Sequence, residues 1–175
     1  MRSGTLRSSV CSSIFSPSNV CRCVEQRFGL IGVQTAVKCC PDAVLLKIMS
    51  LLGAGFDVAS QHELQLALDL GTPADQIIFA NPCKPKSHIA FAREKNIKLM
   101  TFDNAAELVK IKEVYPEAEL VLRMLPPNNA AAICNFGSKF GASLRESERL
   151  LDRAKDLGLH IVGVRCVSAG PIDPS

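Results

Sequence analysis

Five polar or charged side chains each lie at or just beyond the end of a short apolar run in this 175-residue sequence. They are Lys38, Asp57, Asn81, Asp103 and Arg123. A lysine that is partly withdrawn from water loses its proton more readily, and its neutral amine can then attack a carbonyl to form a Schiff base. An arginine offers two parallel donors that fit a carboxylate or a phosphate. These residue types would suit Schiff-base chemistry beside an anion-binding arginine.

Each of these residues also has a purely structural interpretation. Lys38 could lay its aliphatic stem over apolar neighbours and keep its ammonium in water. Asn81 and Asp103 are residue types that cap helices or end strands. Arg123 could simply form an ion pair with Asp57 or Asp103. Position in the sequence is compatible with both sets of interpretations.

Short apolar runs alternate with amphipathic segments from Ala36 onward, and this alternation must position the five residues. The expected strands are 36–38, 56–59, 77–80, 99–102, 120–123 and 160–166. Successive centres among the first five are about 21 residues apart, which fits a crossover helix and is too long for a hairpin. A parallel sheet covered by helices is therefore expected.

Helix boundaries support the same organisation. Two segments have the spacing of a capping box, Ser60-Gln61-His62-Glu63 and Ser143-Leu144-Arg145-Glu146. The helices that start there are expected to end before Gly71 and Gly158, and further helices are expected after Pro41 and over 104–114. Both a (β/α)8 barrel and an open doubly wound sheet fit, and the even spacing favours the barrel. A complete barrel has eight strands in typically about 250 residues, so six strands predict an incomplete α/β barrel.

Composition excludes several classes of protein. Hydrophobic residues make up 47% and charged residues 21% of the chain, as in ordinary globular domains. No uncharged apolar run reaches about 18 residues, so no membrane association is expected. The eight cysteines form neither a CxxC pair nor a zinc spacing, which predicts no metal site and favours a reducing, cytoplasmic location. Acidic and basic residues balance after residue 40, so no nucleic-acid partner is expected.

The first 34 residues differ from the rest of the chain. They are rich in serine, arginine and cysteine and contain no acid before Glu25. That composition is typical of an organelle transit peptide, and an unstructured or artificial N-terminus is the alternative. We expect 1–34 to be a disordered leader, with 35–175 as the folded part and organelle import as a minor alternative to the cytoplasm.

Six short motifs occur in a fixed order along the folded part. They are Ala36-Val37-Lys38-Cys39, 53–60, Ala80-Asn81-Pro82-Cys83-Lys84, Met100-Thr101-Phe102-Asp103, Leu120-Val121-Leu122-Arg123 and Lys139-Phe140-Gly141. Together they resemble the family of eukaryotic ornithine decarboxylase and antizyme inhibitor, whose enzymes use pyridoxal phosphate. The resemblance runs from about residue 35 to 174 and implies an N-terminal barrel that binds this cofactor.

The resemblance also implies roles for particular residues. Lys38 matches the lysine that binds pyridoxal phosphate covalently and takes part in catalysis, and Asp57 and Arg123 match residues near the cofactor. Glu63 matches an acid on the neighbouring helix, and Lys139 matches a lysine that bridges to the partner subunit of a homodimer. The implied reaction is decarboxylation of ornithine to putrescine, in polyamine biosynthesis. Lysine and arginine remain open as substrates.

The sequence departs from the family pattern after Val162-Gly163-Val164. Arg165-Cys166-Val167 follow, where the family has a histidine that stacks on the cofactor ring. The family's glycine-rich phosphate loop, its acid at the pyridine nitrogen and its C-terminal β-domain are not found in the sequence. We therefore expect the chain to be truncated relative to the family and inactive on its own.

A non-catalytic function is the alternative. A relative of antizyme inhibitor would bind antizyme through a surface near 86–110, where five residues are cationic: Lys86, Arg93, Lys95, Lys98 and Lys110. An ordinary solvated helix face explains the same charges. Retention of Lys38, Asp57 and Arg123 favours the decarboxylase.

Overall fold

The structure is a computed structural model that describes residues 34–125 and 141–166. Residues 1–33 of the expected leader, Lys139 and 167–175 lie outside the described residues. Among those described, no helix is long and apolar enough to cross a membrane.

The described residues form one six-stranded sheet in which every strand is parallel to its neighbours. The strands are β1 (Gln34–Ala36), β2 (Gly55–Val58), β3 (Ile77–Phe79), β4 (Leu99–Phe102), β5 (Glu119–Met124) and β6 (His160–Cys166). Their spatial order is their order along the chain. This topology is the one expected from the repeated strand and helix.

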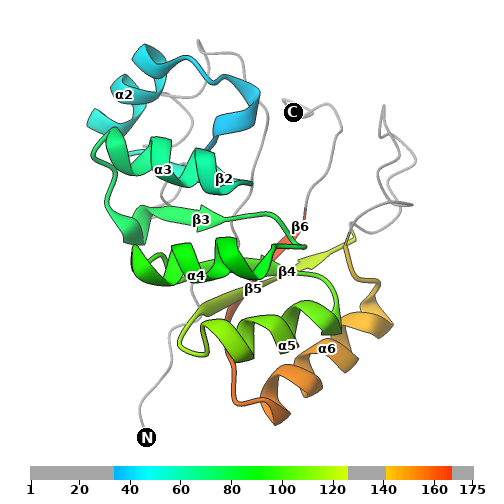
Figure 1. Cartoon of the computed structure of the whole chain (residues 1–175). Helices are drawn as coiled ribbons and strands as arrows, with labels where there is room; N and C mark the ends of the chain where they lie inside the picture. The colour runs from blue at the N-terminus through cyan, green and yellow to red at the C-terminus, as the bar shows by residue number, and fades with distance from the viewer. Residues whose placement is uncertain (1–33, 126–140, 167–175) are drawn as a thin grey trace, which may run out of the picture.

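Helices connect the strands. The α-helices are α2 (Ala43–Leu51), α3 (Gln61–Asp69), α4 (Lys86–Glu94), α5 (Ala105–Val114) and α6 (Leu144–Asp156), with 3-10 turns η1 (Val37–Cys39) and η2 (Ala74–Gln76). In Figure 1, α3, α4, α5 and α6 lie side by side in front of the strands. Helices on a single side of a parallel sheet are typical of a barrel and not of a doubly wound sheet, which has helices on both faces.

Capping explains where the helices begin and end. The Ser143 side chain accepts from the Glu146 N–H while the Glu146 carboxylate accepts from the Ser143 N–H, so the expected capping box is complete. At the start of α3 the box is only half formed, because the Glu63 carboxylate accepts from the N–H of Ala59 instead of Ser60. Positive φ at the residues after α3 and α6 explains why both are glycine, Gly71 and Gly158.

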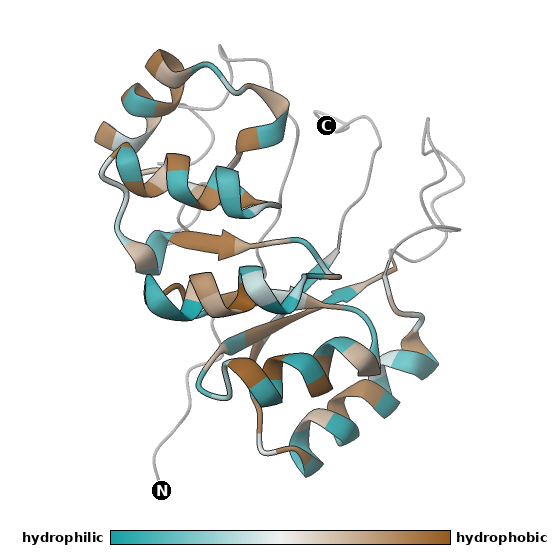
Figure 2. Ribbon diagram, viewed as in Figure 1, coloured by the Kyte–Doolittle hydropathy of each residue, from teal (hydrophilic) through white to brown (hydrophobic). Residues whose placement is uncertain are grey.

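The main core lies between the helices and the sheet. Alternate strand residues face the helices: Phe56, Val58, Ile77, Phe79, Met100, Phe102, Leu120 and Leu122. They pack with the buried residues of α3 to α6, among them Leu64, Ile89 and Leu108. In Figure 2, β3 is brown along its whole length, whereas the helices carry teal residues beside brown ones. The residues between those core positions, such as Asp57, Thr101 and Arg123, point to the opposite face of the sheet.

The opposite face is concave. Asp57 on β2 forms an ion pair with Arg165 on β6, although three strands lie between them. In a flat sheet, four steps of about 4.8 Å would separate these strands by about 19 Å, farther than the two side chains can reach. The sheet must therefore curl toward itself. The described residues form six strands of an incomplete (β/α)8 barrel, as expected from the sequence.

One expected strand is displaced. The sequence predicted a strand over 36–38, but β1 ends at Ala36, and Lys38 belongs to the turn η1. The N–H of Cys40 donates to the carbonyl of Val37 and closes this turn. The chain becomes extended again only at Cys40, after the turn.

Candidate active site

The predicted site residues gather at the carboxyl edge of the sheet. Lys38 follows β1, Asp57 lies near the end of β2, Asp103 follows β4, and Arg123 lies near the end of β5. Ala36 is the register partner of Asp57, and Arg123 is the register partner of Arg165. Because parallel strands end at the same edge, this edge is where a barrel places its reactive groups.

Lys38 is an exposed lysine on an anchored turn. Val37 before it is buried in the core, Cys39 after it is exposed, and Cys40 is half-buried. Burial of Val37 holds the backbone in place while the Lys38 side chain remains in contact with solvent. The Lys38 amine can therefore be reached by a dissolved aldehyde.

Asp57 is engaged by a residue to which sequence reasoning gave no role. Its carboxylate accepts from the Arg165 guanidinium, and only 5% and 6% of the two side chains is exposed. Sequence reasoning instead considered Asp57 as a partner for Arg123. The position of Arg165 in an otherwise apolar strand was a visible signal, but its partner lies 108 residues away and cannot be found from spacing.

Arg123 shares this charged region. Burial lowers the pKa of its guanidinium; Asp103 and Asp57 act in the opposite direction, and Arg165 adds to the lowering. Two guanidinium groups and two carboxylates thus act on one another at the concave face. Their formal charges cancel.

Asp103 links this region to the chain before α6. Its carboxylate accepts from the Asn104 side chain at 3.0 Å and from the N–H of Gly141 at 3.4 Å. The helix cap expected at Asp103 lies one residue later, because the Asn104 side chain accepts from the N–H of Glu107. Asp103 is thus left at the strand end.

Asn81 and Glu63 organise the loops around the edge. The Asn81 amide donates to the Ala59 carbonyl at 3.2 Å, and its oxygen accepts from the N–H of Cys83 at 3.0 Å. The Glu63 carboxylate accepts from the N–H of Ala59 at 2.7 Å. These contacts support the structural interpretation of Asn81 and give Glu63 the role of fixing the end of β2.

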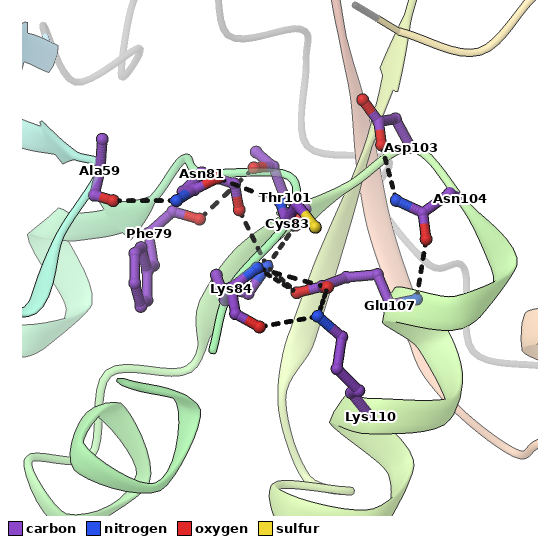
Figure 3. A network of polar contacts seen from close by, with 10 residues as sticks. All are labelled: Ala59, Phe79, Asn81, Cys83, Lys84, Thr101, Asp103, Asn104, Glu107 and Lys110. Carbon is purple, nitrogen blue, oxygen red and sulfur yellow. Dashed lines mark hydrogen bonds and ion pairs between the residues drawn. The ribbon is translucent and has the colours of Figure 1, made fainter. Parts of the chain in front are cut away.

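A buried polar network lies beside the site and was also missed by sequence reasoning (Figure 3). The Lys84 amine contacts the Glu107 carboxylate at 2.8 Å and donates to the carbonyls of Asn81 at 3.0 Å and Thr101 at 2.6 Å. Neither the Lys84 nor the Glu107 side chain is exposed, and Lys110 also pairs with Glu107. Burial lowers the pKa of Lys84, and Glu107 opposes that effect. The network ties the loop after β3 to β4 and α5.

The cationic region over 86–110 is largely neutralised by its own surroundings. Lys86 pairs with Glu113, Arg93 with Glu117, Lys95 with Glu94 and Lys110 with Glu107. These pairs are what the solvated-face interpretation predicts.

Comparison with known proteins agrees with this geometry. The sequence model of the family described as "Pyridoxal-dependent decarboxylase, pyridoxal binding domain" matches residues 18–172. Ornithine decarboxylase of Schizosaccharomyces pombe is 46% identical over 141 residues, which cover 80% of this chain and 32% of that protein. The chain thus spans about a third of the length of this curated relative.

Solved structures share the fold. The arginine decarboxylase of Paramecium bursaria Chlorella virus is 33% identical with a TM-score of 0.75, over 82% of this chain and 38% of that one. The lysine/ornithine decarboxylase of Vibrio vulnificus, solved with putrescine, is 28% identical with a TM-score of 0.68, over 78% and 35%. With its strand order, its curled sheet and the polar residues at its carboxyl edge, the chain belongs to the family of pyridoxal-dependent ornithine, diaminopimelate and arginine decarboxylases.

Proposed function

We propose that this chain contributes the pyridoxal phosphate-binding lysine for decarboxylation of a basic amino acid, with ornithine as the first candidate. The observation that carries the proposal is the placement of Lys38, an exposed amine at the carboxyl edge beside the charged group of Asp57, Arg123 and Arg165. The similarity to an ornithine decarboxylase and to enzymes named for arginine and for lysine and ornithine supports this substrate class.

The described residues fit the cofactor in two respects. The exposed Lys38 can react with an aldehyde, and the guanidinium of Arg123 suits an anion such as a phosphate or carboxylate. When bound, pyridoxal phosphate supplies the electron sink that stabilises the carbon from which CO2 departs. Lys38 would hold the cofactor, and its amine could move a proton once released. Arg123 would orient an anionic group at the concave face.

We assign this reaction to a protein as long as the curated relatives of this chain. The 175-residue chain covers about a third of its relative, so on its own it is expected to release no CO2 from ornithine. The alternative function, a regulator that binds antizyme, gains no support from α4 and α5, whose cations are mostly engaged by neighbouring acids.

A segment exchange tests the proposal. Residues 35–125 would replace the matching segment of Schizosaccharomyces pombe ornithine decarboxylase, and CO2 release from carboxyl-labelled ornithine would be measured. We expect the hybrid to remain active, Lys38→Ala to abolish its activity, and Lys112→Ala, at an exposed position of α5, to leave it unchanged. A folded hybrid without activity, or one that tolerates Lys38→Ala, would refute the assignment.

A further inference from the structure

The ion pair between Asp57 and Arg165 lies in the concave face, and we call this pair the plug. Arg165 reaches from β6 across to β2, and both side chains are buried. The interior of a barrel of this size is just wide enough to be filled by side chains. The space that the Arg165 side chain occupies between β6 and β2 is therefore closed to any other group.

Lys38 lies just after the end of β1, the strand that pairs with β2 and therefore with Asp57. It follows Ala36 by two residues, and Ala36 is the register partner of Asp57. A cofactor held by Lys38 that enters the concave face must therefore meet Asp57 and Arg165. The neighbouring Arg123 is the register partner of Arg165, so the two guanidinium groups lie on adjacent strands of the same face.

The opposite charges of Asp57 and Arg165 hold the plug closed. A buried carboxylate that has lost its cationic partner is strongly disfavoured, so Asp57 releases Arg165 only at considerable cost. While the pair is closed, this Asp57 oxygen is occupied and cannot accept from another group. Arg123 stays next to Asp103, which also receives the N–H of Gly141.

We propose that Arg165 is an autoinhibitory residue, whose ion pair with Asp57 must open before pyridoxal phosphate binds fully at Lys38. This inference rests on the proposed function, because it concerns the cofactor that Lys38 would hold. It explains an arginine inside an apolar strand by a contact that no neighbouring strand provides. It also predicts that the wild-type chain takes up the cofactor poorly.

The test uses the complete 175-residue chain and does not depend on turnover. The chain is titrated with pyridoxal phosphate and treated with borohydride, which fixes the cofactor on a lysine as a secondary amine, and peptide masses report the labelling of Lys38. Labelling of the exposed Lys155 serves as the internal reference for nonspecific reaction. If release of Arg165 consumes as little as 1.4 kcal/mol, Arg165→Gln should label Lys38 at about tenfold lower cofactor concentration.

Controls separate the plug from a general loosening of the fold. Arg149→Gln makes the same charge change at an exposed position of α6 and should label like the wild type. Asp57→Asn/Arg165→Gln replaces both charges by amides that can still hydrogen-bond. It should also label Lys38 at lower concentration, and it serves if Arg165→Gln alone does not give a native circular dichroism spectrum. Lys38→Ala in the Arg165→Gln chain should abolish the added label.

A second measurement needs no variant. At cofactor concentrations that label Lys38 in the wild-type chain, Arg165 should become reactive to phenylglyoxal, whereas without cofactor it should be protected. Folded variants that label Lys38 no better than the wild type, weaker labelling, or an Arg165 that stays protected would overturn the inference. An inactive segment hybrid would instead count against the proposed function, because that hybrid does not include Arg165.

Discussion

The pairing of Lys84 with Glu107 makes a quantitative prediction about stability. Both side chains are fully buried, and the Lys84 amine is also held by the carbonyls of Asn81 and Thr101. Glu107→Gln keeps the shape of the side chain and an oxygen for the N–H of Lys84, but leaves the ammonium without its buried anion. Loss of one member of a buried pair costs about 3–5 kcal/mol, and the retained amide favours the lower end.

Lys84→Met, which removes the other member of the ion pair, should lower the free energy of unfolding by less than Glu107→Gln does. The effects of the two substitutions should not be additive. Lys84→Met fills the space with an unbranched apolar chain, and Glu107 keeps the backbone N–H and Lys110. Two carbonyls lose a donor, at about 1 kcal/mol each, because Thr101 lies in a paired strand and Asn81 is partly exposed. In the double variant no fully buried charge is left unpaired, and Glu107→Gln removes only the ion pair with the partly exposed Lys110, so it should add about 1 kcal/mol or less to Lys84→Met. The expected coupling is about 2–3 kcal/mol, within the stability of about 5–15 kcal/mol of a typical domain.

Urea unfolding followed by circular dichroism would measure the four free energies of unfolding. Additivity within about 0.5 kcal/mol would refute the reasoning, because independent sites behave that way. The pH dependence gives a second check. Burial lowers the pKa of Lys84 below its ordinary 10.5, and removing Glu107 lowers it further.

Between the lowered pKa and 10.5, the unfolded chain binds more protons than the folded one, so stability rises with pH. The difference in the free energy of unfolding between the wild type and Glu107→Gln should therefore shrink as the pH is raised from neutrality toward 10.5. The loss of stability of Lys84→Met/Glu107→Gln should not shrink in this way, because this variant has no lysine at position 84.

Two further predictions concern the start of α6 and the packing of β2. Ser143→Ala should cost about 1 kcal/mol in urea unfolding by removing the cap of α6. Hydrogen bonds from Ser143 hold the pKa of Glu146 below its ordinary 4.5, so its stabilising effect is complete above that pH and is lost as the pH falls through the lowered value. The stability gap between the wild type and Glu146→Ala should thus close in acid, and an undiminished gap at pH 3 would contradict this. Gly55→Ala should cost about 1–3 kcal/mol, because its Cβ would lie 2.4 Å from the carbonyl oxygen of Gln76. Gly163→Ala meets no described atom within 4 Å and should change stability by less than about 0.5 kcal/mol; equal effects of the two substitutions would show that the contact at Gly55 is unimportant.

The parts of the fold that depend on local chemistry could be predicted from the sequence. Alternating apolar runs, glycines after helices and the Ser143 capping box predicted the six strands and four of the five helices within one or two residues of those observed, whereas α4 was not predicted. Lys38 was expected to end a strand and instead lies in a turn, which the hydrogen bond from the Cys40 N–H to the Val37 carbonyl closes. That difference is also local and concerns only the boundary.

The contacts that depend on curvature could not be predicted. Arg165 finds Asp57 because the sheet curls, and curvature is a property of all six described strands together. Lys84 is similar: no role was predicted for it, yet the carbonyls of Asn81 in the loop after β3 and of Thr101 in β4, with the carboxylate of Glu107 on α5, enclose its amine. Sequence reasoning placed these residues at the carboxyl ends of the strands, where they lie in the structure, but it did not identify the partners of their charges.

The order of the strands also has a consequence for how the site assembles. Each strand pairs with the next along the chain, so most of the sheet can form from segments close in sequence, which favours rapid folding. The contact between Asp57 and Arg165 instead joins residues 108 positions apart. Its closure must wait until β6 has docked, and β6 borders only β5 within the described sheet. Within the described residues, the concave face between β2 and β6 can therefore close only after β6 has docked on β5, and a loosened β6 would expose Asp57.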